Sequence, residues 1–160
     1  TISGCTSETL LRPRGLIVDK PRISREAMLA QVATVVAQRA TCGRRQVGAV
    51  IAREGRILST GYNGPAQHRP HCMKGLCDPS VPCTRSIHAE ANAIAFAARE
   101  GISLLGSDLF VTLSPCVSCA QLIANTGIQR VFYLDLYREP DGILWLEKHT
   151  NVLATHWKEP

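Results

Sequence analysis

Aromatic residues are scarce in this chain of 160 residues, where phenylalanine, tryptophan and tyrosine together make up 5%. Proteins that stack unpaired nucleic-acid bases use an aromatic-rich surface, so this composition argues against such a function. Long apolar runs are also missing, because the stretch VGAVIA is flanked by Arg45 and Arg53. It is far shorter than the roughly 18 residues of a membrane span, so a membrane protein is not expected.

The N-terminal sequence TISGCTSETLLRPRG lacks the apolar core of a secretory signal. Seven cysteines are an odd number, which does not suit a framework of paired disulfides. We therefore expect reduced thiols and a cytoplasmic protein. Residues 1–22, with two prolines and mixed polarity, are expected to form an N-terminal extension. Residues 23–160 are expected to form one domain.

Basic residues outnumber acidic ones by 18 to 13, which gives a formal net charge of +5 and a pI near 9.0. They are scattered, and the longest run is the pair Arg44 and Arg45. This distribution favours a small phosphorylated ligand over an extended nucleic-acid track, although a basic balance is often only a solvated surface.

Hydrophobic periodicity and turn residues predict elements in the order αββαβαβαβ, which is typical of a layered α/β domain. Glu54-Gly55 predicts the turn of a hairpin between the first two strands. The first helix is expected to follow Ser24 and to carry apolar residues on one stripe, namely Met28, Val32, Val35 and Val36. The expected helices are 25–40, 86–100, 115–126 and 143–149, and the expected strands are 47–53, 56–62, 109–114, 130–137 and 152–157.

His88 and Glu90 fall in the first turn of the second expected helix. By themselves they are better explained as a core histidine and a capping carboxylate. Cys116 and Cys119 change this interpretation, because they lie three residues apart on the opening turn of the next helix and can face the same side. With His88 they offer one nitrogen and two sulfurs to a tetrahedral zinc whose fourth position stays open, as in catalytic zinc sites.

Glu90 has a place in such a site, because it follows the ligand His88 by two residues and can lie beside the open position. There it can accept a proton from a water on the metal, whose pKa falls to about 7. A redox C-x-x-C pair is the alternative for Cys116 and Cys119, but it leaves His88 and Glu90 unexplained. The sequence therefore predicts a catalytic zinc with Glu90 as the proton-transfer residue.

The residues HAE at 88–90 and PCVSC at 115–119 resemble the signature of the cytidine deaminase superfamily. Residues 24–155 are most similar to the deoxycytidylate (dCMP) deaminases through CGRRQVGAVI, GRILSTGYNGP, IHAEANAI, TLSPCVSCA and RVFYLDLY. The resemblance implies a three-layer α/β/α cytidine deaminase-like fold, with a central mixed sheet of about five strands. It also implies zinc-dependent hydrolysis of dCMP to dUMP and ammonia, which supplies dUMP for thymidylate synthesis. A homo-oligomer such as a hexamer, with control by dCTP and dTTP, is implied as well.

The same resemblance assigns substrate contacts. Asn63 in GYNG matches the asparagine that holds the deoxyribose, although a turn asparagine beside Gly64 explains it too. Arg44 and Arg45 match the basic pair near the nucleotide phosphate, and the alternative for them is a solvated loop. Tyr137 lies where a phosphate-contacting tyrosine is expected.

The segment HCMKGLCDPSVPC at 71–83 contains three cysteines but no apolar periodicity, so packing does not explain its thiols. Cys42 precedes the first strand of the hairpin and the segment follows the second, so antiparallel pairing brings both to one side. Four thiols are the ligand number of a structural zinc: Cys42, Cys72, Cys77 and Cys83.

Some phage-type members of the family carry such a second zinc, on cysteines that Cys42 and Cys72 match. Cys77 and Cys83 are added here from count and spacing, and His71 or His68 can replace one thiolate. A disulfide or unrelated loop thiols are the alternatives.

Two other functions remain open. The first is deamination of another cytosine nucleotide, such as dCTP or a 5-substituted dCMP, or of a polynucleotide. The second is a non-catalytic binding module stabilised by zinc. Glu90 argues against that module, because a structural zinc has no use for an unligated carboxylate beside it.

Overall fold

The computed structural model of the protein describes residues 22–72, 77, 80–81 and 83–158. The expected N-terminal extension therefore lies outside the described residues except for Arg22, and so does Cys5. The order of elements is the predicted one. Their bounds are α1 (Arg25–Ala37), β1 (Gly48–Arg53), β2 (Arg56–Tyr62), α2 (Ala89–Arg99), β3 (Asp108–Leu113), α3 (Val117–Thr126), β4 (Arg130–Asp135), α4 (Asp141–His149) and β5 (Leu153–His156).

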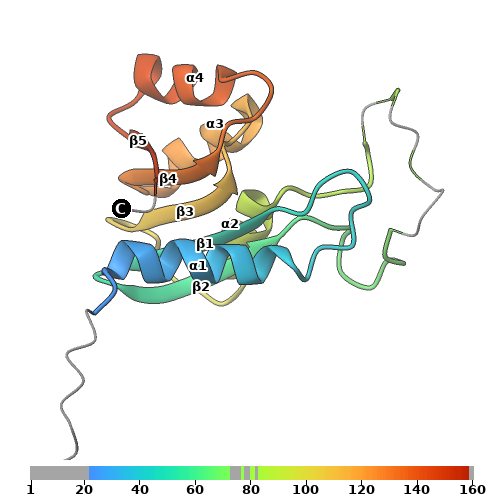
Figure 1. Ribbon diagram of the computed structural model, residues 1–160, viewed down its shortest axis with the longest axis horizontal. Coiled ribbons are helices and arrows are strands. Elements are labelled where there is room, and N and C mark those ends of the chain that lie inside the picture. Colours follow the sequence, from blue (N-terminus) through green and yellow to red (C-terminus); the bar gives the residue numbers. More distant parts are fainter. Residues whose placement is uncertain (1–21, 73–76, 78–79, 82, 159–160) are drawn as a thin grey trace, which may run out of the picture.

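The five strands form one mixed sheet in the order β2-β1-β3-β4-β5 (Figure 1). β1 is antiparallel to both of its neighbours, whereas β3, β4 and β5 are parallel to one another. The hairpin between β1 and β2 turns at Glu54 and Gly55, which both have positive φ angles, as predicted. Because β1 is antiparallel to both neighbours, the loop before β1 lies at the edge of the sheet where β2 and β3 end.

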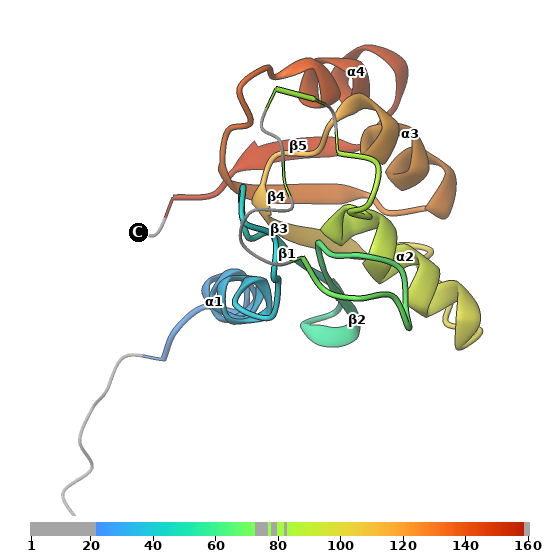
Figure 2. The same ribbon diagram turned by 90° about the vertical axis from the view of Figure 1, so that its right-hand side faces the viewer.

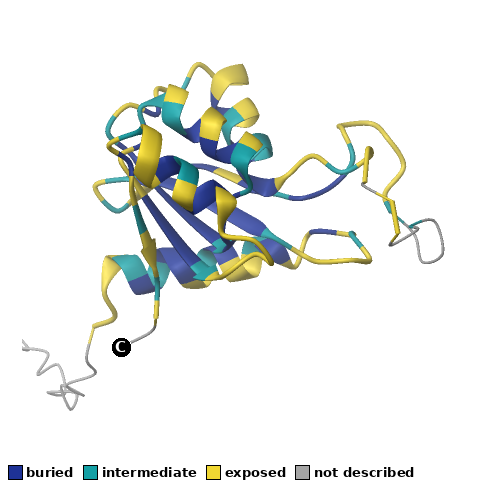
Figure 3. Ribbon diagram, turned by 90° about the horizontal axis from the view of Figure 1, so that it is seen from above, coloured by how far each residue is buried: buried dark blue, intermediate teal, exposed yellow. Residues whose placement is uncertain are grey.

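Helices cover both faces of the sheet, with α1 on one face and α2, α3 and α4 on the other (Figure 2). The strands between them are buried, as the view from above shows (Figure 3). β1 is an example, because Val50 and Ile51 point to opposite faces and both are fully buried. The predicted three-layer α/β/α fold with a mixed sheet of five strands is confirmed.

The predicted apolar stripe of α1 is confirmed only in part, because Met28, Val32 and Val36 are half-buried against the core but the fully buried face of the helix lies beside them. Val35 is 61% exposed, and the buried residues are Ala27, Leu29, Ala30, Ala33 and Ala37. A close approach explains the difference, because a β-carbon on Gly48 of β1 would collide with the backbone of Ala33 and Ala37. Only small side chains fit between helix and strand at that distance, so the bulkier valines lie at the flanks.

The longest helix, α1, has 13 residues. No helix in the described part of the chain has both the length and the apolar character needed to cross a membrane.

Candidate metal and active site

The beginnings of two helices carry the candidate metal ligands. His88 is the N-cap residue of α2 and Cys116 the N-cap residue of α3, and both have extended backbone angles. The sequence prediction began this helix at residue 86 and so placed His88 inside it, whereas α2 begins three residues later, at Ala89. Neither side chain caps its own helix, so the imidazole and the thiol remain available for another partner.

The start of α2 is fixed tightly against β2. A β-carbon on Gly61 would collide with the carbonyl oxygen of Ala89, so only glycine allows this approach. The side-chain amide of Asn92 donates a hydrogen bond to the carbonyl oxygen of Tyr62 at 2.8 Å. Gly64 and Ile87 exchange two backbone hydrogen bonds, of 3.1 and 2.8 Å. His88 therefore follows a segment that is held by the end of the hairpin.

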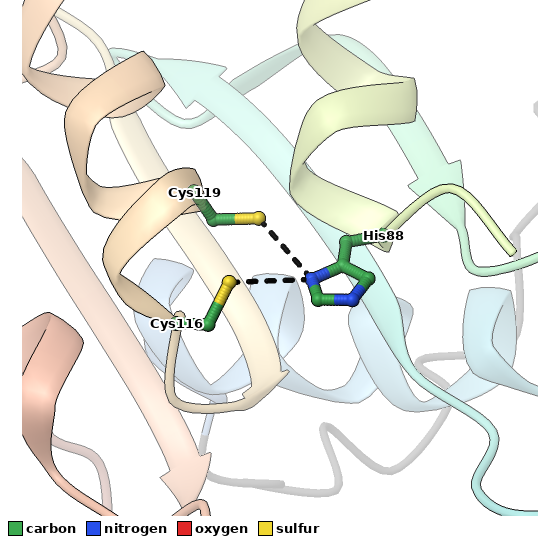
Figure 4. Close-up of side chains that lie close together, drawn as sticks. All are labelled: His88, Cys116 and Cys119. Carbon is green, nitrogen blue, oxygen red and sulfur yellow. Dashed lines mark hydrogen bonds between the residues drawn. The ribbon is translucent and has the colours of Figure 1, made fainter. Parts of the chain in front are cut away.

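His88, Cys116 and Cys119 have the geometry of a metal site. The Nδ1 atom of His88 lies 3.4 Å from each of the two sulfurs, which face it from α3 (Figure 4). Around a tetrahedral zinc, with ligand distances of about 2.3 Å to sulfur and 2.1 Å to nitrogen, these atoms would be about 3.6 Å apart. The three donor atoms all lie within 4.8 Å of one another. The donor set and its spacing therefore fit a zinc ion with little rearrangement.

The electrostatics of this cluster favour a thiolate beside a protonated imidazole. Hydrogen bonds from Cys119 and then from His88 lower the pKa of Cys116 to about 3. The bond to Cys116 in turn raises the pKa of His88. The neighbouring Cys116 sulfur and burial both raise the pKa of Cys119, so one thiol of the pair keeps its proton until a cation arrives. A metal ion would replace these protons.

Glu90 lies in the first turn of α2 and is only 3% exposed. Burial raises the pKa of its carboxyl group, and the nearby imidazole of His88 lowers it less. The carboxyl group and the thiol of Cys119 interact by a hydrogen bond. A buried acid with an elevated pKa beside a metal-ligand cluster is the arrangement expected of a proton-transfer group.

Asn63 is buried and ties two loops together. Its Oδ1 accepts a hydrogen bond of 2.7 Å from the backbone N–H of Val47, and its Nδ2 donates one of 2.9 Å to the carbonyl oxygen of Arg45. The amide therefore fixes the loop that carries Arg45. This explains a buried asparagine without a substrate, and its contact with a sugar stays a prediction.

Arg44 and Arg45 point to different partners. The Arg44 guanidinium donates to the sulfur of Cys77 at 3.0 Å and to the carbonyl oxygen of Val81 at 2.8 Å. Arg45 forms an ion pair of 3.4 Å with Asp135, the last residue of β4. Of the two predicted phosphate contacts, Arg44 is thus engaged by the cysteine segment, whereas Arg45 lies beside β4.

Tyr137 is 45% exposed. Its backbone N–H donates to the hydroxyl of Ser114 at 2.8 Å, and Ser114 directly precedes Pro115 and Cys116. The backbone of Tyr137 therefore lies near the start of α3, and the phosphate contact of its side chain stays a prediction.

Sequence analysis missed a hollow of about 560 Å³ between the end of β2 and α2. Its lining includes several groups that can bind an anion: His68, Arg69, His71 and Arg99. The Arg99 guanidinium lies over the ring of Phe96, 4.7 Å from its centre, and donates to Gln67 at 3.1 Å. The pattern that could have revealed it is the spacing of Phe96 and Arg99, which share one side of α2.

The four thiols of the proposed second zinc site, on Cys42, Cys72, Cys77 and Cys83, do not form a metal site in the structure. In the described residues, the metal-competent group is His88, Cys116 and Cys119, and no second such group is formed. The six cysteines that the structure describes are all free thiols, so the disulfide alternative finds no support among them. The two segments do approach each other, because the hydroxyl of Thr41 lies 3.2 Å from Nδ1 of His71.

The fold and the cluster define an α/β domain with a zinc-type site built from two helix starts. Residues 23–135 match the family described as the cytidine and deoxycytidylate deaminase zinc-binding region. The chain belongs to this cytidine and deoxycytidylate deaminase family.

Relatives agree with this assignment. The deoxycytidylate deaminase of Enterobacteria phage T2 is 38% identical, over 67% of this chain and 78% of its own. That of Mycobacterium phage D29 is 41% identical, over 64% and 88%. Among solved structures, the dCMP deaminase from the cyanophage S-TIM5, in complex with dCMP and dUMP, is similar with a TM-score of 0.76 and 31% identity. This similarity covers 85% of this chain and 98% of that one. The resemblance to deoxycytidylate deaminases is thus confirmed.

Proposed function

We propose that this protein hydrolyses dCMP to dUMP and ammonia, with His88, Cys116 and Cys119 as the ligands of a catalytic zinc. The single observation that carries this proposal is the position of buried Glu90 next to three donor atoms within 4.8 Å of one another. The S-TIM5 enzyme, which is described with dCMP and dUMP bound, supports the choice of nucleotide. We take residues 23–160 as one catalytic domain.

The reaction replaces the amine on C4 of cytosine by oxygen. When bound, a zinc ion would supply the positive charge that acidifies a water and stabilises negative charge developing on oxygen. Glu90 takes a proton from the attacking water and delivers protons to N3 and to the departing amine. Burial raises the pKa of its carboxyl group, so Glu90 can hold each proton between these transfers.

Arg45 is the better candidate for the 5′-phosphate, because the Arg44 guanidinium donates at 3.0 and 2.8 Å to Cys77 and Val81, whereas Arg45 is held by one longer, exposed ion pair of 3.4 Å. A phosphate forms charge-assisted hydrogen bonds that deoxycytidine cannot form. We expect kcat/KM for dCMP to exceed that for deoxycytidine by at least about 100-fold, or roughly 3 kcal/mol. Ammonia release with dCMP, dCTP, deoxycytidine and single-stranded DNA measures this and tests the proposed function.

Arg45→Ala should reduce the preference for dCMP over deoxycytidine. Arg56→Ala is the matched control, because Arg56 is an exposed arginine at the opposite end of the hairpin. Equal rates on nucleoside and nucleotide would contradict the phosphate contact. A preference for single-stranded DNA would instead support a polynucleotide deaminase.

A second, structural zinc on Cys42, Cys72, Cys77 and Cys83 remains part of the proposal. What supports it is the convergence of three of these thiols on Arg44. Cys77, and more weakly Cys83 and Cys42, raise the pKa of that guanidinium. Thiols that lie near one guanidinium in this way belong to segments that approach each other, as the ligands of one metal ion must.

We expect two zinc ions per chain by elemental analysis of protein purified without chelator. Cys77→Ser or Cys83→Ser should lower the melting temperature and the affinity for dCMP more than kcat, because the site would shape the pocket and not the chemistry. Cys5→Ser is the matched control, since it removes a thiol that neither site uses. One zinc per chain would refute the second site.

Control by dCTP or dTTP also stays a proposal. The hollow beside α2 offers His68, Arg69 and Arg99 to phosphates and the ring of Phe96 to a base, and a nucleotide needs both kinds of contact. Rates with dCMP should change when dCTP or dTTP is added, and Arg99→Ala should abolish the change.

A homo-oligomer is proposed as well, and the molar mass from light scattering tests it.

The free thiols of the described cysteines support a reducing compartment, which we infer to be the cytoplasm.

A further inference from the structure

The ion pair between Arg45 and Asp135 joins residues 90 positions apart in the sequence. Their charged atoms are 3.4 Å apart, and the two side chains are 51% and 70% exposed. Arg45 lies in the loop before β1, and Asp135 ends β4. The pair is too exposed to contribute much to stability.

Two chains of contacts lead from this pair to the metal ligands. The carbonyl oxygen of Arg45 is held by Asn63, and the next residue, Gly64, pairs with Ile87 directly before His88. The carbonyl oxygen of Asp135 accepts a hydrogen bond of 2.8 Å from Ser114, two residues before Cys116. The ion pair therefore lies between the two segments that deliver the ligands.

We propose that Asp135 is a specificity-determining residue that limits how much negative charge a bound nucleotide carries at its 5′ end. This inference rests on the proposed function, in which Arg45 contacts the 5′-phosphate. A carboxylate beside Arg45 competes with the phosphate for the guanidinium. It also repels each further phosphate that extends past the first.

The expected size of the effect follows from simple electrostatics. One added negative charge about 7 Å from a carboxylate in water-like surroundings weakens binding roughly threefold. The penalty multiplies with each charge, so nucleoside, monophosphate and diphosphate should form a graded series. Salt shortens the screening length from about 10 Å at 0.1 M to about 3 Å at 1 M, which should flatten that series.

The test compares the wild-type protein with Asp135→Asn on deoxycytidine, dCMP and dCDP. The diphosphate is used because dCTP is also proposed as an effector. We expect the ratio of kcat/KM between variant and wild type to stay near one for deoxycytidine. It should rise about twofold for each negative charge on the nucleotide at 0.01 M salt, where the screening length is about 30 Å, by a smaller factor at 0.1 M, and hardly at all at 1 M.

Two further variants separate charge from structure. Asp135→Glu keeps the charge and should retain the wild-type series. Asp108→Asn breaks a closer ion pair, of 2.6 Å to Arg130, at the opposite end of the same two strands, and should change all three substrates by the same factor.

An Asp135→Asn ratio that is equal for all three substrates, or that falls with charge, would overturn the role of Asp135. The proposed function has a separate failure, namely a wild-type protein that does not release ammonia from dCMP. An active wild type with a flat series would reject the inference alone.

Discussion

Replacement of Glu90 by glutamine should lower kcat for dCMP at least about a thousandfold, while the protein still folds and holds zinc. A single general acid–base group contributes about 10²- to 10⁴-fold, and Glu90 is proposed to serve several proton transfers in one turnover. Glutamine has nearly the same shape but cannot carry the proton. Because burial already opposes ionisation of Glu90, its neutral replacement should not disturb the surrounding packing.

Three measurements decide this prediction: kcat with saturating dCMP, zinc content by elemental analysis, and the melting temperature. Glu147→Gln is the control, because Glu147 is an exposed residue of α4 and should leave all three unchanged. A Glu90→Gln protein that keeps more than a few per cent of wild-type activity would contradict the assigned role. Loss of zinc from the same variant would mean that Glu90 supports the metal site itself.

The candidate metal cluster could be predicted because its information is local. Cys116 and Cys119 share one turn, and His88 and Glu90 share another, so residue spacing alone orients each pair. Only the meeting of the two helix starts is a tertiary property. The matched signature supplied that step, and the 3.4 Å contacts from His88 to both sulfurs bear it out.

Which face of α1 is fully buried could not be predicted, because two stripes of that helix are apolar and residues of both pack against the core. Sequence periodicity favoured the stripe with the larger valines, whereas the residues fully buried against the sheet are mostly alanines. The deciding residue, Gly48, lies on another element, and its lack of a side chain matters only once β1 and α1 are in contact. The sheet order, which places β1 between β2 and β3, sets that contact.

The division between Arg44 and Arg45 is hidden from the sequence for the same reason. The two residues are adjacent and chemically identical, yet one contacts Cys77 and the other Asp135. These partners lie 33 and 90 residues away, and neither carries a local signal. Long-range pairs of this kind follow from the topology and not from spacing.

Removal of a metal ligand should abolish activity together with zinc binding, which distinguishes it from the Glu90 variant. Cys116→Ser is the cleaner substitution, because Cys116 is partly exposed whereas Cys119 is buried. Its loss of kcat/KM should exceed the roughly 10- to 100-fold that follows when only an outer partner of a ligand is removed. His88→Ala and Cys119→Ser should behave in the same way, with an added loss of stability for the buried thiol.

Zinc content shows which site each variant has lost. If the wild type binds two ions, Cys116→Ser should retain only the second, structural zinc. Cys77→Ser should retain only the catalytic zinc, and its kcat should be unchanged. Adding zinc should restore activity to wild-type protein stripped by a chelator but not to Cys116→Ser, because the donor set itself is incomplete. A Cys116→Ser protein with full zinc content and full activity would show that Cys116 is not a ligand, and the cluster at the two helix starts would need another explanation.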